Sequence, residues 1–123
     1  MDYIRKVDFE AIENSNAGER FVQKLYDYKS GSKNCTVDCV KTPPGGGSLS
    51  GLHFHDFDQI FYILEGTMHI EIEGKHYDCH SGSLILFPAG MPHRNWNGTN
   101  EPLVFLDFNT PLPDPNAPFS KPL

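Results

Sequence analysis

The sequence predicts a single all-β domain, folded as a sandwich or a barrel. Short apolar or alternating segments recur along the chain, and turns containing glycine or proline separate them about every 8 to 12 residues. The length of 123 residues is that of one domain. Aromatic residues make up 12% of the chain, with nine phenylalanines among them, and such residues favour strands and an apolar interior.

The chain divides into three predicted parts. Residues 1–20 form a mixed, polar N-terminal extension, residues 21–109 the β-barrel domain, and residues 110–123 a proline-rich tail. Within the extension, residues 7–12 are compatible with a short strand or with one helical turn. The tail holds five prolines and no strand or helix pattern, so we expect an extended, polyproline-like chain. It is either disordered or docked through Phe119 on the barrel or on a partner subunit.

The first half of the barrel domain contains two predicted strands, at residues 21–28 and 35–41. Two prolines and three glycines make residues 42–48 a loop. Cys35 and Cys39 share one face of the second strand but lie about 13 Å apart along it, which is too far for a disulfide. We therefore interpret both as small core or rim residues.

Further strands are predicted at residues 52–55, 59–65, 67–73, 76–79, 84–87, 93–96 and 103–108. Residues 67–73 alternate cleanly between apolar and polar side chains, which is typical of a half-buried strand. Residues 59–65 are apolar on both faces, so the outer face of that strand needs a cover. A second subunit is the economical cover, and we therefore expect a homodimer.

Composition and charge exclude several classes of partner. The formal net charge is −6, and an acidic surface argues against nucleic acid or an anionic membrane as the partner. No run approaches 18 apolar residues, so we expect no transmembrane helix. The start of the sequence lacks the apolar core of a signal peptide, and three cysteines do not make a disulfide framework. These features predict a cytoplasmic protein.

Three histidines and one glutamine form the candidate metal site: His53, His55, Gln59 and His93. His53 and His55 are two residues apart, so on a strand they point to the same face, roughly 7 Å apart. His93 follows a turn at residues 88–92 that ends one strand and directs the next. Imidazole is the commonest protein ligand for divalent transition metals, and we therefore predict one such ion as the cofactor.

Either the chain turns before Gln59, or Gln59 is not a metal ligand. A straight strand would place Gln59 roughly 13 Å from His55, which is too far for both to bind one ion. Asp56 and Asp58 favour a turn between His55 and Gln59. These two aspartates are also alternative acidic ligands, and Gln59 can instead be a core amide that orients a ligand without contacting the metal. A nitrogen-rich site accepts Zn, Ni, Fe, Mn, Co and Cu, so the sequence does not distinguish among these ions.

The spacing of these residues resembles the two motifs of the cupin family. The first motif is Gly, five residues, His-x-His, three or four residues, an acid, six residues and Gly, and it corresponds here to Gly47, His53, His55, Gln59 and Gly66. The second is Gly, five residues, Pro-x-Gly, two residues, His, three residues and Asn, and it corresponds to Gly82, Pro88, Gly90, His93 and Asn97. Every position matches except Gln59, where the family usually has glutamate.

The resemblance implies a fold, a site and an assembly. The fold would be the cupin double-stranded β-helix, a jelly-roll barrel, with the metal inside it. Small cupins often dimerise by packing or swapping outer strands, which agrees with the homodimer expected above. Residues 67–81 separate the two motifs, as in compact single-domain cupins.

Gln59 changes the expected chemistry. With four neutral ligands the ion would keep its double charge and act as a stronger Lewis acid, whereas an amide cannot serve as a general base. A glutamine here resembles certain isomerase, cyclase and lyase cupins, so we predict an enzyme of the isomerase or lyase type acting on a small organic acid, carbonyl compound or phenolic. A cupin dioxygenase using Fe or another transition metal and a non-catalytic ligand-binding cupin are the alternatives.

Two further sets of residues complete the prediction. The candidates for lining the substrate pocket are Phe57, Phe61, Asn95 and Trp96. A proton shift would need a separate acid or base, because the amide of Gln59 is neither. The candidates for that role are Tyr62, Asp107, His69, His76 and His80.

Overall fold

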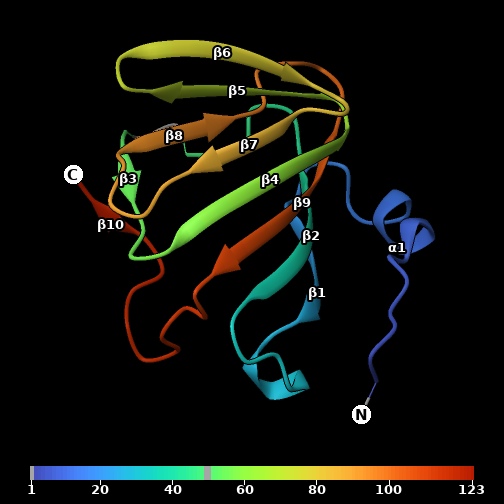
Figure 1. Ribbon diagram of the computed structural model, residues 1–123. Helices are drawn as coiled ribbons and strands as arrows, with labels where there is room; N and C mark the ends of the chain where they lie inside the picture. The colour runs from blue at the N-terminus through green and yellow to red at the C-terminus, as the bar shows by residue number, and fades with distance from the viewer. Residues whose placement is uncertain (1, 49–50) are drawn as a thin grey trace.

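The computed structural model describes residues 2–48 and 51–123, which form two five-stranded antiparallel sheets facing each other (Figure 1). One sheet has the strand order β1-β2-β9-β4-β7 and the other β10-β3-β8-β5-β6. The strands are β1 (Phe21–Tyr26), β2 (Thr36–Thr42), β3 (His53–Phe54), β4 (Asp58–Glu65), β5 (Thr67–Ile72), β6 (Lys75–His80), β7 (Leu84–Phe87), β8 (His93–Trp96), β9 (Leu103–Thr110) and β10 (Lys121–Pro122). The predicted jelly-roll barrel is confirmed.

The barrel interior is apolar at one end and polar at the other. Along β4, Phe61 and Ile63 are buried in the core, because alternate residues of a strand face the same side. The apolar core consists of Val40, Phe61, Ile63, Met68, Ile70, Ile85, Phe87, Leu103 and Phe105. On the same faces of β4 and β9, the next buried side chains are the polar Gln59, Asp107 and Asn109. The polar end is therefore the part of the barrel that can form a binding or catalytic site.

Two motif glycines are required by close backbone approaches. Gly47 has φ +117°, and a Cβ atom there would lie 2.5 Å from the carbonyl oxygen of Asn95. Gly66 has φ +85°, and its Cβ would lie 2.4 Å from the carbonyl oxygen of Pro102. Neither position has space for a side chain, and positive φ values favour glycine. These glycines let the loops pass close to the strands that position the site.

The N-terminal extension covers part of the outer face of the β1-β2-β9-β4 layer (Figure 1). Residues Phe9–Glu13 form the short helix α1, which settles the choice between strand and helical turn. Its Ile12 is 3% exposed and packs with Cys39 and Val104, in a cluster that Leu64 joins. The cover over this end of β4 is thus the chain's own extension, which was not anticipated.

The first strand is shorter than predicted. β1 ends at Tyr26, and a 3-10 helix, η1 (Tyr28–Ser30), follows it. Asp27 caps this helix, since its carboxylate accepts a hydrogen bond from the Ser30 main chain while the Ser30 hydroxyl receives one from the Asp27 main chain. Reciprocal caps of this kind favour a helical turn over a continued strand.

The proline-rich tail returns to the barrel. Its last residues form β10, in which Lys121 pairs with Phe54 and Pro122 with His53 of β3. In Figure 1 the C-terminus accordingly lies beside β3, at the opposite side of the molecule from α1. The open question of a disordered or docked tail is answered by docking on the chain's own barrel, so the tail belongs to the second sheet.

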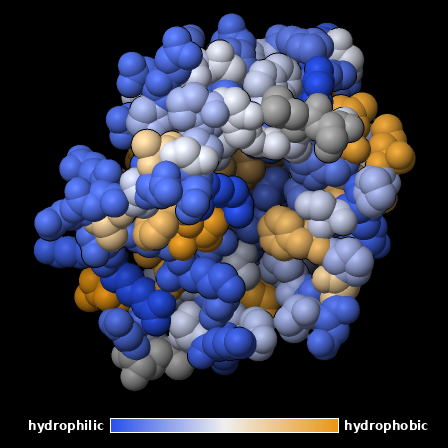
Figure 2. Space-filling model, turned by 180° about the vertical axis from the view of Figure 1, so that it is seen from behind, coloured by the Kyte–Doolittle hydropathy of each residue, from blue (hydrophilic) through white to orange (hydrophobic). Residues whose placement is uncertain are grey.

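The face shown in Figure 2 is mostly hydrophilic and is hollowed near its centre, with hydrophobic side chains beside the hollow. Among the described residues, no helix has the length and hydropathy needed to cross a bilayer.

Candidate metal centre

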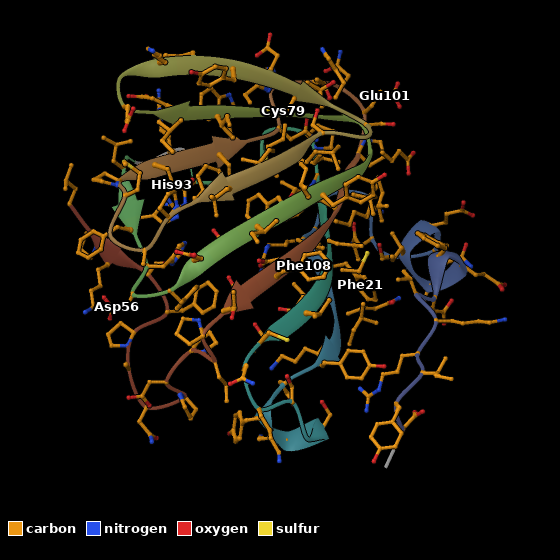
Figure 3. The ribbon with its side chains drawn as sticks, in the orientation of Figure 1. Phe21, Asp56, Cys79, His93, Glu101 and Phe108 are labelled. Carbon is orange, nitrogen blue, oxygen red and sulfur yellow. The ribbon has the colours of Figure 1, made fainter. Side chains whose placement is uncertain are left out.

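Three histidines from separate segments converge at the polar end of the barrel. β3 supplies His53, the loop after it supplies His55, and β8 supplies His93, which is the pairing partner of His53. One ring nitrogen of each lies within 4.8 Å of the others. Figure 3 shows His93 between β8 and β3. Three imidazole nitrogens this close can bind one divalent ion.

Main-chain carbonyls orient the two buried rings. His55 Nδ1 lies 2.8 Å from the Phe119 carbonyl oxygen, and His93 Nδ1 lies 3.0 Å from that of Met91. Because a carbonyl oxygen only accepts, both Nδ1 atoms must donate, which leaves each Nε2 with a free lone pair. Among the described residues, both Nε2 atoms are buried and lack a hydrogen-bond partner. A buried imidazole held in this way is the usual arrangement of a metal ligand.

The environment favours the neutral form of His53 and His93, which is the form that binds metal. Burial lowers the pKa of His93 to about 4, against the opposing effect of its hydrogen bond to Met91. Burial, followed by the repulsion of a protonated His55, also lowers the pKa of His53. His93 is further fixed by Phe87, whose ring stacks on it with centroids 3.9 Å apart.

Gln59 and Asp107 form a polar pair beside the histidines. Gln59 is 4% exposed, and its Nε2 donates to Asp107 Oδ1 over 3.3 Å. This bond leaves Oε1 as the amide atom available to a ligand, and within residues 2–48 and 51–123 that oxygen accepts no hydrogen bond. Burial and then the neighbouring Asp38 raise the pKa of Asp107 to about 7, while the hydrogen bonds from Gln59 and Asn109 oppose the rise.

A cavity of about 410 Å³ lies beside these groups, and His53, His55, Gln59 and Asp107 line it. The described residues lining it are Arg20, Thr42, Gly47, Ser48, His53, His55, Gln59, Phe61, Asn95, Phe105, Asp107, Phe119 and Ser120. Phe61 and Asn95 were predicted for this pocket. Arg20, Phe119 and Ser120 were missed, because they lie outside both motifs and no local pattern places them beside the histidines.

Two predicted pocket residues lie elsewhere. Phe57 stacks on the His55 ring, with centroids 5.0 Å apart, and so packs against a candidate metal ligand. Trp96 stacks on His69 with centroids 5.6 Å apart. Side chains alternate along β8, so His93 and Asn95 point inward and Trp96 points outward. The prediction that Trp96 lines the pocket is therefore wrong.

The alternative acidic ligands are engaged in the surrounding loops. Asp58 Oδ1 accepts a hydrogen bond from the Ala89 main chain at 2.9 Å, which joins the turn of the first motif to that of the second. Asp56 forms a 2.7 Å ion pair with Lys121. Both carboxylates therefore fix the loops that carry the histidines instead of joining the cluster.

Of the candidate proton-transfer groups, Asp107 is the one that lines the cavity among the described residues. Tyr62 is 39% exposed on the outer face of β4. The histidines of β5 and β6 have other partners: His69 accepts a hydrogen bond from Gly98, His76 lies 3.6 Å from Glu71, and His80 hydrogen-bonds Thr67.

The fold and this cluster define a jelly-roll barrel with three histidines at metal-binding distance inside it. The chain belongs to the cupin family, since residues 39–109 match the cupin domain. None of the curated proteins matches the chain significantly.

Solved structures with the same fold include several of named activity. The polyketide cyclase RemF from Streptomyces resistomycificus has a TM-score of 0.75 and 23% identity, over 100% of this chain and 85% of that one. A predicted oxalate decarboxylase from Thermotoga maritima has a TM-score of 0.67 and 29% identity, over 77% and 83%. The DMSP lyase DddQ from Ruegeria pomeroyi has a TM-score of 0.65 and 21% identity, over 80% and 49%.

Proposed function

We propose that this cupin is a metal-dependent enzyme of the isomerase or lyase type, acting on a small organic acid. The observation that carries the proposal is the pair of buried Nε2 atoms, on His55 and His93, that have no hydrogen-bond partner among the described residues. A divalent ion held by these atoms and His53 would act as a Lewis acid on an oxygen of the substrate. Gln59 Oε1 remains the predicted fourth ligand.

The cavity supplies the other requirements of such a reaction. A volume of about 410 Å³ is within the range of small-molecule pockets. Arg20 is the permanently charged cation among the described lining residues, and a guanidinium is well suited to a carboxylate. This favours an organic acid over the neutral carbonyl or phenolic substrates considered from the sequence.

Asp107 is assigned the proton transfer because of its place in the cavity wall. The hydrogen bond from Gln59 Nε2 orients its carboxyl group, and its neighbours in the wall include Arg20 and Phe61. A carboxyl group positioned in this way can take a proton from one substrate carbon and return it to another. The cyclase, the lyase and the predicted decarboxylase of similar fold support an enzyme of the lyase type.

The test combines metal analysis with a defined substrate panel. The purified protein is stripped with chelator and reloaded separately with Zn²⁺, Ni²⁺, Fe²⁺, Mn²⁺, Co²⁺ or Cu²⁺. Each form is incubated with enolisable keto acids, beginning with oxaloacetate, while products and dissolved oxygen are followed. We expect one ion per chain and metal-dependent conversion without oxygen consumption. Oxygen uptake by the Fe²⁺ form would support the dioxygenase alternative, and binding without turnover would support the ligand-binding one.

A further inference from the structure

We propose that the C-terminal strap, defined as residues 119–123, orients one of the ligands of the metal centre. The main-chain carbonyl of Phe119 holds the His55 ring in the orientation that presents Nε2 to a metal ion. The inference rests on the metal site proposed above, and it makes Phe119 a positioning residue contributed by a segment with no recognisable motif.

The hydrogen bond to His55 links residues far apart in the sequence. His55 Nδ1 and the Phe119 carbonyl oxygen are 2.8 Å apart and separated by 64 positions in the chain. The matching bond of His93 goes to Met91, only two positions away and inside the second motif. One buried ligand is thus oriented locally, whereas the other depends on the return of the tail.

Ring packing gives the same contact a second support. The Phe119 ring meets His55 with centroids 5.1 Å apart and Phe57 with centroids 4.9 Å apart. Phe57 in turn stacks on His55. Rotation of the His55 ring would therefore break a hydrogen bond and disturb a cluster of three rings, so a docked strap restricts the imidazole to one orientation.

Beyond Phe119, few contacts hold the strap. β10 has two residues, Leu123 donates one main-chain hydrogen bond to Leu52 over 3.3 Å, and Lys121 pairs with Asp56. The two side chains of that ion pair are 41% and 58% exposed. Figure 3 shows Asp56 in the loop between β3 and β4, next to the returning tail. A segment held by so few buried contacts opens more readily than the interior strands.

The strap also forms part of the cavity wall, because Phe119 and Ser120 both line it. Opening of the strap would therefore widen the cavity and release His55 in the same movement. Metal affinity and access to the cavity are coupled through one short segment.

The principal test uses the full-length chain with the substitutions Phe119→Ala and Lys121→Glu combined. Two readouts are taken. In the metal-free protein, long-range proton–nitrogen NMR correlation reports which nitrogen of His55 carries the proton. The affinity for Co²⁺ is measured by chelator competition, with the visible spectrum reporting the ligand geometry. The matched control combines Phe119→Leu with Lys121→Arg, which keeps the bulk and the charge.

We expect the combined variant to lose the single Nδ1–H form of His55 and to bind Co²⁺ about tenfold to a hundredfold more weakly. The conservative control should behave as the wild type. Lys75→Glu, in the exposed β6, makes the same charge change away from the site. Added negative charge alone would strengthen cation binding, so a loss of affinity in the combined variant cannot come from charge.

The exposed ion pair offers a milder second test if the combined variant does not fold. Lys121→Glu should speed hydrogen exchange at the Leu123 amide and weaken Co²⁺ binding, and the swap Asp56→Lys with Lys121→Glu should restore both. Unchanged Co²⁺ affinity and an unchanged His55 proton position in a folded strap variant would overturn the strap proposal alone. A wild-type protein that binds no Co²⁺ would overturn the proposed function and the strap proposal with it.

Discussion

The two buried histidines of the centre are oriented in the same way, because each Nδ1 donates a hydrogen bond to a main-chain carbonyl oxygen. Phe119 serves His55 and Met91 serves His93, and the two Nε2 atoms are left buried without partners among the described residues. An unsatisfied buried nitrogen destabilises a fold, so a pair of them next to a third histidine is an arrangement that metal binding would stabilise.

His93→Ala is expected to abolish stoichiometric metal binding, because it removes the candidate ligand at the most buried position of the cluster. Gln59→Glu should retain the ion, since a carboxylate is also a metal ligand. Metal content after dialysis, measured by plasma mass spectrometry, checks both, with circular dichroism to confirm folding. Unchanged metal content in the folded His93→Ala protein would contradict the assignment.

Asp107→Asn is expected to separate the proposed catalysis from metal binding. The amide keeps an oxygen for the hydrogen bond from Gln59 but cannot accept a substrate proton, so turnover should fall about a hundredfold or more while metal content stays at the wild-type level. The melting temperature near neutral pH should rise, since burial disfavours the charged carboxylate that the neutral amide replaces. Asp78→Asn, on the exposed β6, is the matched control. Wild-type turnover in Asp107→Asn would remove this residue from the mechanism.

Among the elements, the N-terminal helix α1 stabilises the fold and lies outside the candidate metal centre. Ile12 packs with Cys39 and Val104 on the outer face of the sheet, away from the cavity. This packing covers an apolar face that the sequence indicated would need a partner.

Ile12→Ala should therefore lower the free energy of unfolding by about 2 to 4 kcal/mol, as expected for a large-to-small change at a buried site. Metal content should not change. Ile4→Ala is the control, because Ile4 lies in the same extension and is 86% exposed. Urea denaturation measures both. Equal stability of the two variants would show that α1 does not pack on the barrel in solution.

How far each element could be predicted depends on whether its residues carry a local pattern. Turns marked by glycine and proline separate the strands, and residues 67–73 alternate with period two, so most strand positions follow from the sequence. The buried face of β4 does not, because residues 59–65 are apolar on both faces. The same period places Trp96 outward, and applying it to β8 would have excluded this residue from the pocket.

The remaining features depend on contacts between distant segments. The tail is proline-rich and has no period, and β10 exists only because β3 offers it an edge to pair with. Arg20 precedes β1 without any motif, so its place in the cavity wall follows only from the packed barrel. The three histidines could be predicted because both motifs keep a fixed spacing.

The whole molecule exposes apolar side chains on β4, β7 and the edge strand β6, which α1 does not cover. Tyr62, Tyr77, Leu84 and Leu86 are 39%, 46%, 71% and 53% exposed, and Tyr62 is the pairing partner of Leu84. A shallow groove between β6 and β7 includes three of these side chains. Contiguous exposed apolar surface is typical of an interface, and the homodimer stays a prediction with this surface as its contact.

Leu84→Asp combined with Leu86→Asp should convert a dimeric wild type into a folded monomer, because each change places a charge in the proposed contact. Light scattering coupled to size-exclusion chromatography measures the mass. Ile4→Asp is the control, since it alters an exposed apolar residue outside this surface. A wild type that elutes as a monomer at high concentration would contradict the predicted dimer.

The central claim is that one metal ion sits among three histidines inside the barrel. The most direct measurement is anomalous diffraction at the zinc edge from crystals of the zinc-loaded protein. We predict a single peak inside the barrel, about 2.0 to 2.1 Å from one nitrogen each of His53, His55 and His93. Peaks confined to the surface, or three rings that point away from one another, would contradict it.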